Sequence, residues 1–286
     1  MLKWQLVGDS SCDVKSGSLS EENIGFDTVP LKILVGDKEF VDIASTDPME
    51  MLSAVKHYNG PSSSACPSPG EFAEQFKKAE CSFAVTLTGQ LSGSYNAALQ
   101  AKNMVLDEYP EKKIHVIDSL GTSGSITLIL NKIKEFIAQG MEFEEIVRKI
   151  DQYRDSVVLV FALGSYDMLI KNGRMSRVAG IMAGVLNIRA VSYNPGGVIK
   201  VLEKPRGEKK AIERMVALAK ERFAKKPNTP VIVTHCNNPK GAKELCDELK
   251  KQCGVEMSEI TILECACLTS YYAGDQGLLL AFEGTF

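Results

Sequence analysis

Ser92, Gly93 and Ser94 lie in a small, hydroxyl-rich turn between two segments of different periodicity. Residues 83–88, before the turn, form an apolar, β-branched run of the kind found in buried strands. Residues 97–105, after it, combine strong helix formers with apolar side chains at helical spacing. The start of a helix carries unpaired amides and a partial positive charge, so this turn predicts a site for a carboxylate or a phosphate. The alternative is that one of the two serines only caps the helix.

A second serine-rich loop, residues 62–72, has the same character and also leads into a predicted helix. Ser68 and Glu71 have the spacing of a capping box, and Pro69 occupies the first helical position, so Ser68 has a structural function. Ser64 has no such local function and is a candidate ligand contact. The presence of two such turns in one chain favours a binding site over isolated helix caps.

Asp9 and Asp13 frame three small polar residues directly after the expected first strand, 4–8. In open α/β sheets, ligands gather at this end of the strands. Two acids in this place can bind a metal or orient a hydroxyl group. They can equally form a turn by hydrogen bonding to their own backbone. The sequence does not decide between these interpretations.

These turns must be positioned by the elements around them, and the first half of the chain alternates strands with helices. Such alternation predicts an α/β fold with a parallel sheet and helices on both faces. Asp47 and Pro48 mark one helix start, with an N-cap residue followed by proline in the first turn. The expected strands are 4–8, 28–35, 83–88 and 114–117, and the expected helices are 48–58, 69–78, 95–109, 123–139 and 142–153.

The second half has a different pattern, typical of an α+β domain. A Pro-Gly-Gly turn at 195–197 sits between two strand-like runs, which predicts a hairpin over 189–203. The chain has 286 residues, more than one domain usually holds, so we expect two domains, 1–155 and 156–286. The other expected elements are strands 157–161, 230–235 and 259–264 and helices 167–171, 181–186, 205–223 and 239–252.

The overall composition is that of an ordinary globular protein, with 44% hydrophobic and 24% charged residues. The formal net charge of −3 argues against a basic surface for nucleic acid. No apolar run approaches the length of a membrane span, and the chain begins in a strand-like segment without the features of a signal peptide.

Eight cysteines are scattered along the chain, and none forms a Cys-x-x-Cys pair. With only three histidines beside them, the spacing of a zinc site is missing. We therefore expect no metal and interpret the cysteines as free thiols of a reducing cytoplasm. Cys12 and Cys66 belong to the candidate binding loops, so either could face a ligand cleft.

Taken together, the two serine-rich turns and the segment from Asp9 to Asp13 resemble the DegV family of bacterial fatty-acid-binding proteins. The family pattern contains Asp-Ser-Thr-Cys-Asp, Thr-Ser-Gln-Pro-Ser-Pro-Gly, Leu-Ser-Gly-Thr-Tyr and an Asp-Ser pair after a strand. Several motifs in the same order are more specific than any one of them, and they cover nearly the whole chain. The matching segments are 9–13, 64–70, 91–95, 116–119, 172–176, 186–189 and 197–211.

The resemblance implies a two-domain α/β protein that binds a long-chain fatty acid in a tunnel between its domains. Each buried methylene contributes about 0.8 kcal/mol, so the acyl chain can supply most of the affinity. By motif, Ser64 and Ser92 would contact the carboxylate, and Gly93 and Ser94 would add amide or hydroxyl contacts. Ser64 replaces the usual threonine and keeps its hydroxyl. No cofactor is expected besides the fatty acid as ligand.

Arg174 and Arg206 resemble the family's arginines near the ligand mouth. In the fatty-acid kinase system that this family serves, a separate kinase subunit phosphorylates the bound carboxylate. A guanidinium suits a phosphoryl group because it is planar, permanently charged and bidentate. Without the resemblance, both would be interpreted as ordinary surface cations, since Arg206 lies among lysines.

The C-terminal region departs from the family pattern. Many relatives carry His-x-Gly-Pro-Gly, and that histidine is thought to approach the carboxylate. The comparable stretch here is 273–277, with Ala273 at the histidine position and Tyr271 and Tyr272 just before it. Either a tyrosine hydroxyl replaces the histidine or the head group is held differently.

Two other functions remain open. One is a hydrolase or transferase with Ser92 as nucleophile, which would need His57, His115 or His235 as its base. The glycine two residues before a nucleophile-elbow serine is missing here, because Gln90 stands in its place. The second is a non-catalytic carrier of a different apolar acid, such as a branched or modified acyl chain.

Overall fold

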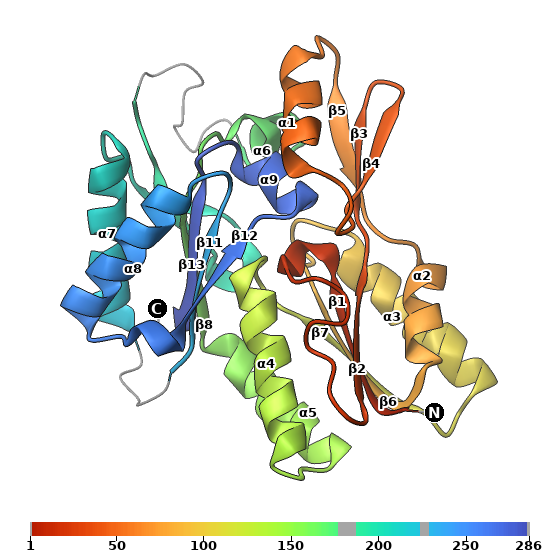
Figure 1. The fold of residues 1–286 in the computed structure, drawn as a ribbon. Helices are drawn as coiled ribbons and strands as arrows, with labels where there is room; N and C mark the ends of the chain where they lie inside the picture. The colour runs from red at the N-terminus through yellow and green to blue at the C-terminus, as the bar shows by residue number, and fades with distance from the viewer. Residues whose placement is uncertain (1, 177–186, 224–228, 285–286) are drawn as a thin grey trace.

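The computed structural model describes residues 2–176, 187–223 and 229–284 (Figure 1). The predicted helix 181–186 lies outside these residues. The strands are β1 (Leu2–Asp9), β2 (Ile24–Val29), β3 (Lys32–Val35), β4 (Lys38–Val41), β5 (Ser62–Ala65), β6 (Ala79–Thr86), β7 (Lys113–Asp118), β8 (Val157–Ala162), β9 (Val191–Tyr193), β10 (Lys200–Glu203), β11 (Val231–His235), β12 (Ile260–Glu264) and β13 (Leu278–Glu283). The helices are α1 (Pro48–His57), α2 (Pro69–Phe76), α3 (Ser94–Glu108), α4 (Gly124–Ala138), α5 (Phe143–Asp155), α6 (Asp167–Lys171), α7 (Glu208–Arg222), α8 (Pro239–Cys253) and α9 (Cys267–Ala273).

Sheet A is the parallel sheet that the first half of the sequence predicts. Its order is β2-β1-β6-β7, and every neighbouring pair is parallel. Successive side chains of a strand point to opposite faces, so Phe83 packs toward α4 and α5 while Ala84 packs toward α2 and α3. Helices therefore cover both faces (Figure 1), and the expected α/β class is confirmed.

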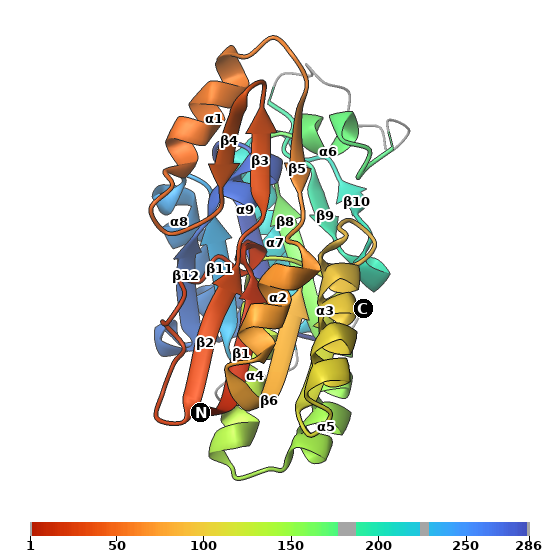
Figure 2. The ribbon, with the colours of Figure 1, turned by 90° about the vertical axis from the view of Figure 1, so that its right-hand side faces the viewer.

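Sheet B is a small antiparallel sheet of order β4-β3-β5 that the sequence analysis did not predict. The run 28–35 was expected as one strand, but it is divided after Val29 because Pro30 has no N–H to continue a ladder. Its second part becomes β3 and leaves sheet A. Figure 2 shows sheet B continuing beyond one end of sheet A, next to α9.

Sheet C has the order β10-β9-β8-β13-β11-β12 and is mixed, with β11 and β12 as its parallel pair. The predicted hairpin is present as β9 and β10, joined by a 3-10 turn at Pro195–Gly197. Helices α7 and α8 cover one face of the sheet, and the other face is turned toward α4 (Figure 1). The second half is therefore α+β, as expected.

One hydrophobic core joins the two halves of the chain through α4. This helix packs against β6 of sheet A and against β8, β11 and β13 of sheet C. The contact at Gly124 is so close that a Cβ atom there would lie 2.9 Å from Cγ2 of Ile232 and 3.0 Å from Cβ of Ala281. Sheets A and B contain strands from before residue 119 and sheet C contains strands from after residue 156, so we retain 1–155 and 156–286 as proposed domains.

Candidate ligand-binding site

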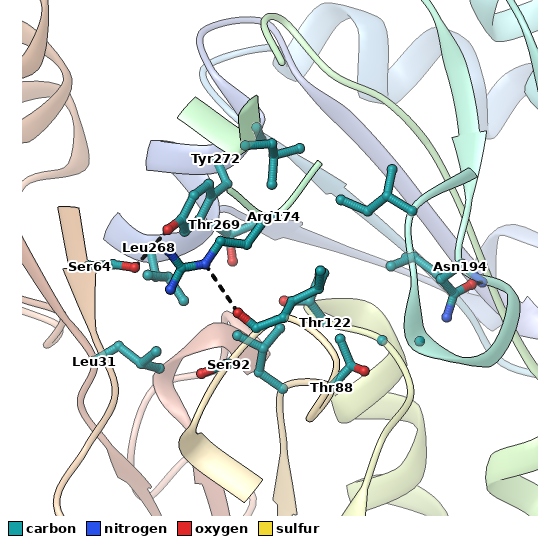
Figure 3. Close-up of a pocket in the computed structure, with 18 of the residues that line it drawn as sticks. Leu31, Ser64, Thr88, Ser92, Thr122, Arg174, Asn194, Leu268, Thr269 and Tyr272 are labelled. Carbon is teal, nitrogen blue, oxygen red and sulfur yellow. Dashed lines mark hydrogen bonds between the residues drawn. The ribbon is translucent and has the colours of Figure 1, made fainter. Parts of the chain in front are cut away.

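A cavity of about 320 Å³ lies between the two halves of the chain, within the size range of ligand pockets (Figure 3). The loops after β5 and β6 line it from the first half. From the second half, α9 and the face of sheet C that carries Leu159, Phe161 and Leu279 line it. Most of the lining is apolar; Ser64, Tyr272 and Arg174 lie together at one end, while Thr88, Thr122 and Asn194 are polar residues farther along it. The cavity can therefore hold a molecule with a long apolar part and one polar end.

Ser64 and Tyr272 meet at the polar end of the cavity. Ser64 Oγ and the Tyr272 hydroxyl are 2.7 Å apart (Figure 3). Ser62 lies on the same face of β5, two residues earlier, and its Oγ is 2.7 Å from the Tyr271 hydroxyl. Two serines of sheet B therefore pair with two consecutive tyrosines of α9, which fixes the Tyr272 hydroxyl at the cavity.

Arg174 supplies a positive charge beside this pair. Its Nε donates to the Leu91 carbonyl at 3.2 Å and its Nη1 to the Asn172 carbonyl at 2.7 Å. Among the described residues, no carboxylate forms a salt bridge with Arg174. Burial raises the pKa of Tyr272, while the hydrogen bond with Ser64 and the charge of Arg174 work in the opposite direction. Tyr272 is thus a neutral hydroxyl that lies near the Arg174 guanidinium, which has no salt-bridge partner among the described residues.

Ser92 and Gly93 line the cavity immediately before α3 begins. Ser92 Oγ accepts a hydrogen bond from the Ser94 amide at 3.2 Å, so it also closes the first turn of the helix. A Cβ atom at position 93 would lie 3.0 Å from Cys66 Sγ, which shows how closely the two serine-rich loops approach. Ser68 forms the predicted capping box with Glu71 and belongs to α2.

Ser94 is buried and does not line the described cavity. Its hydroxyl donates to Asp9 Oδ2 at 2.6 Å, and the same oxygen accepts from the Leu87 amide at 2.7 Å. Asp9 Oδ1 accepts from the Ser11 hydroxyl at 2.6 Å. Burial raises the pKa of Asp9, although these hydrogen bonds work against the shift. Asp9 therefore orients two hydroxyls and also accepts a hydrogen bond from the backbone of Ser11, so it serves both of the non-metal roles considered for it.

Arg206 is exposed and is not among the described residues that line the cavity. Its backbone forms a bridge with Ile188. Of the six predicted site residues, Ser64, Ser92, Gly93 and Arg174 come together at one cavity, whereas Ser94 and Arg206 lie elsewhere.

Two residues after Ala273 have left-handed backbone conformations. Gly274 and Gln276 both have φ of 67°, in the region that favours glycine. Ala273, expected at the histidine position, precedes both of them. The Ala273 side chain is buried and lines the cavity.

The histidines do not support a nucleophilic Ser92. None of them is among the described residues lining the cavity. His115 lies on β7 with its Nε2 3.5 Å from Asp151 Oδ1, and His57 is on the exposed side of α1. His235 Nδ1 accepts from the Asn238 amide at 3.3 Å. The arrangement at Ser92 therefore suits hydrogen bonding to an anion better than proton abstraction.

One of the eight cysteines lies at this cavity. All eight cysteines are free thiols; Cys66 lines the cavity, and Cys12 is buried in the core. Within the described ranges, no group of three or more His, Cys, Asp or Glu is arranged to hold a metal ion. None of the helices there is long and apolar enough to span a bilayer.

Known proteins resemble this chain over its whole length. The family described as uncharacterised proteins of the DegV family matches residues 3–283. A DegV domain-containing protein of Streptococcus pneumoniae is 38% identical over 284 residues, 99% of each chain.

Solved structures of DegV proteins also resemble this chain over nearly its whole length. The fatty acid kinase B3 protein of Streptococcus pneumoniae, loaded with linoleic acid, is 37% identical, with a TM-score of 0.92 and 99% of both chains covered. A DegV family protein of Eubacterium eligens, loaded with heptadecanoic acid, is 32% identical, with a TM-score of 0.91 over 99% of this chain and 100% of that one. The chain described above therefore belongs to the DegV family.

Proposed function

We propose that this chain is a non-catalytic carrier that binds one long-chain fatty acid between its two halves. The observation that carries this proposal is the cavity itself, which is mostly apolar and has the Ser64–Tyr272 pair and Arg174 together at one end. An ionised fatty acid has the matching distribution of polar and apolar surface. Two similar structures, from Streptococcus pneumoniae and Eubacterium eligens, contain linoleic and heptadecanoic acid.

In this proposal the carboxylate binds at the hydroxyl-lined end. Ser64 and Tyr272 exchange their mutual hydrogen bond for bonds to the carboxylate, and Ser92 and Gly93 add a hydroxyl and an amide at the start of α3. Arg174 contributes the favourable charge. Ser94 acts indirectly, because its hydroxyl bond to Asp9 fixes the turn that presents Ser92.

The acyl chain lies along the aliphatic wall formed by the two halves. Each methylene that leaves water contributes about 0.8 kcal/mol, so about sixteen methylenes would supply roughly 13 kcal/mol before the costs of binding are subtracted. Leu159, Phe161 and Leu279 of sheet C are the side chains that we assign to this wall.

A separate kinase is the proposed partner. The relative from Streptococcus pneumoniae is described as a fatty acid kinase protein, and a carrier can present its carboxylate for phosphorylation. Arg174, at the cavity, and Arg206, on the surface, are the cations that we assign to the phosphoryl-transfer step. We place the protein in the cytoplasm, where its eight free thiols would stay reduced.

Denaturing extraction of the purified protein, followed by mass spectrometry of the released lipids, tests this function. We expect a fatty acid at about one molecule per chain, as for a saturated single site. An extract without fatty acid, together with failure of the delipidated protein to bind oleic acid, would refute the proposal. If a different apolar acid is released at the same stoichiometry, that acid is the cargo and the fatty-acid assignment is wrong.

A further inference from the structure

The helix that carries Tyr272, α9, is too short to be stable without contacts to the rest of the protein. α9 has seven residues, and isolated helices of this length are unstable in water. Its first turn also has amides without partners inside the helix. Ala266, the residue before it, provides no side-chain cap. The position of Tyr272 therefore depends on contacts made outside α9.

At the start of α9, those contacts include hydrogen bonds to two aspartates of the first half of the chain. Asp42 Oδ1 accepts from the Cys267 amide at 2.7 Å, and its Oδ2 accepts from the Leu268 amide at 3.2 Å. Asp13 Oδ1 accepts from the Ala266 amide at 2.8 Å. Three consecutive amides at the start of α9 are thus held by carboxylates that are far away in the sequence.

Asp42 is tied to the same small sheet that carries Ser64. It directly follows β4, and its amide donates to the Leu31 carbonyl at 2.9 Å, just before β3. On the other side of β3, Ile33 is paired with Ser64 of β5. Sheet B therefore holds Ser64 at one edge and, through Asp42, the start of α9 at the other.

We propose that Asp42 and Asp13 are positioning residues for the carboxylate-binding site, setting the Tyr272 hydroxyl at the distance from Ser64 that a carboxylate can bridge. This inference rests on the proposed function, because it concerns the same head-group site. Neither aspartate is among the described residues lining the cavity, so each acts through α9. Asp42 is 3% exposed, and its two bonds from amides to a charged acceptor are of the strong, charge-assisted kind.

Asp42→Asn tests the proposal with the least change in volume. The asparagine oxygen can accept one of the two amides, but its NH₂ group faces the other amide as a second donor. We expect oleic acid to bind about tenfold more weakly, the loss typical of one hydrogen bond to a charged group. Methyl oleate, which has the same chain and no carboxylate, should lose much less affinity.

A double-mutant cycle with Tyr272→Phe separates positioning from general destabilisation. If Asp42 acts through Tyr272, Asp42→Asn should cause little further loss of oleic acid affinity once the hydroxyl is absent. Asp47→Ala is the matched control, because Asp47 caps α1 with an accepted bond from the Met49 amide at 2.8 Å and does not contact α9 in this way. It should lower stability and leave oleic acid affinity unchanged.

The outcomes distinguish this inference from the proposed function. The inference would be overturned if Asp42→Asn bound oleic acid with wild-type affinity. It would also be overturned if Asp42→Asn lost as much oleic acid affinity in the Tyr272→Phe background as in the wild-type background. Either result would leave the proposed function intact. Failure of the wild-type protein to bind oleic acid would overturn both. If Asp42→Asn does not fold, Asp13→Asn loosens the same turn through Ala266 and carries the same expectations.

Discussion

At the scale of single residues, the proposed carboxylate site depends on hydroxyls that already have partners inside the protein. Ser64 is paired with Tyr272, and Ser92 accepts from the amide of Ser94. In the proposed binding mode, a ligand carboxylate replaces at least the first of these bonds, because an ionised acceptor makes a stronger bond than a neutral hydroxyl does. The neighbouring Arg174 compensates the negative charge that the ligand brings.

Replacing Ser64 and Ser92 together by alanine should weaken oleic acid binding by about a hundredfold, since each hydroxyl gives up one bond to a charged group. Titration calorimetry of the delipidated protein measures this loss. Ser68→Ala is the control: it removes the capping box of α2 and should lower stability by about 1 kcal/mol without changing affinity. Unchanged affinity in the double variant would show that the carboxylate binds elsewhere.

The aspartates that hold α9 should make stability depend on pH. Burial raises the pKa of Asp13 to about 7 and that of Asp42 to about 6, from an ordinary value of 3.8. The folded protein therefore binds these protons more tightly than the unfolded chain does. Their contribution to the free energy of unfolding is greatest below about pH 4 and is lost as the pH rises through about 6 and 7.

Asp13→Asn, which cannot ionise, should therefore gain stability relative to the wild type as the pH rises. Urea denaturation of both proteins at about pH 4.5 and about pH 8 measures the difference. A difference in unfolding free energy that is the same at both values would contradict the raised pKa of Asp13.

At the scale of elements, local signals predict helix starts and the strands β1, β6 and β7 of sheet A, whereas β2 is predicted only in its last two residues, and sheet B and α9 depend on distant partners. Asp47 and Pro48 are sufficient to mark the start of α1. The Ser-rich run of β5 has low strand propensity and becomes a strand only by pairing with β3. No local sequence signal predicts α9 either, because Asp13 and Asp42 hold its first turn from the other half of the chain.

The close packing of α4 on sheet C gives a prediction about a single glycine. Gly124→Ala should destabilise the protein by about 1–3 kcal/mol, because the new methyl group would press on Ile232 and Ala281. Gly70→Ala, in the first turn of α2, is the matched control: the nearest atom to a Cβ there is 3.9 Å away. That variant should be neutral or slightly more stable. Thermal unfolding compares the two, and a neutral Gly124→Ala would argue against close contact of α4 with sheet C.

At the scale of the whole molecule, the proposed function depends on a cavity that both halves of the chain line. The motifs placed Ser64, Ser92, Gly93 and Arg174 near one another, because the family resemblance covers both halves. They also suggested Ser94 and Arg206, whose side chains face the interior and the surface. Residue type and loop position cannot distinguish these cases, since the direction of a side chain is decided by packing across the interface between the halves.

A crystal structure of the protein with bound oleic acid is the most direct test of the central claim. We predict an acyl chain along the wall of Leu159, Phe161 and Leu279, with its carboxylate within hydrogen-bond distance of Ser64, Ser92 and Tyr272. An oleic acid molecule bound outside this cavity, or inside it with the carboxylate at the opposite end, would contradict the account.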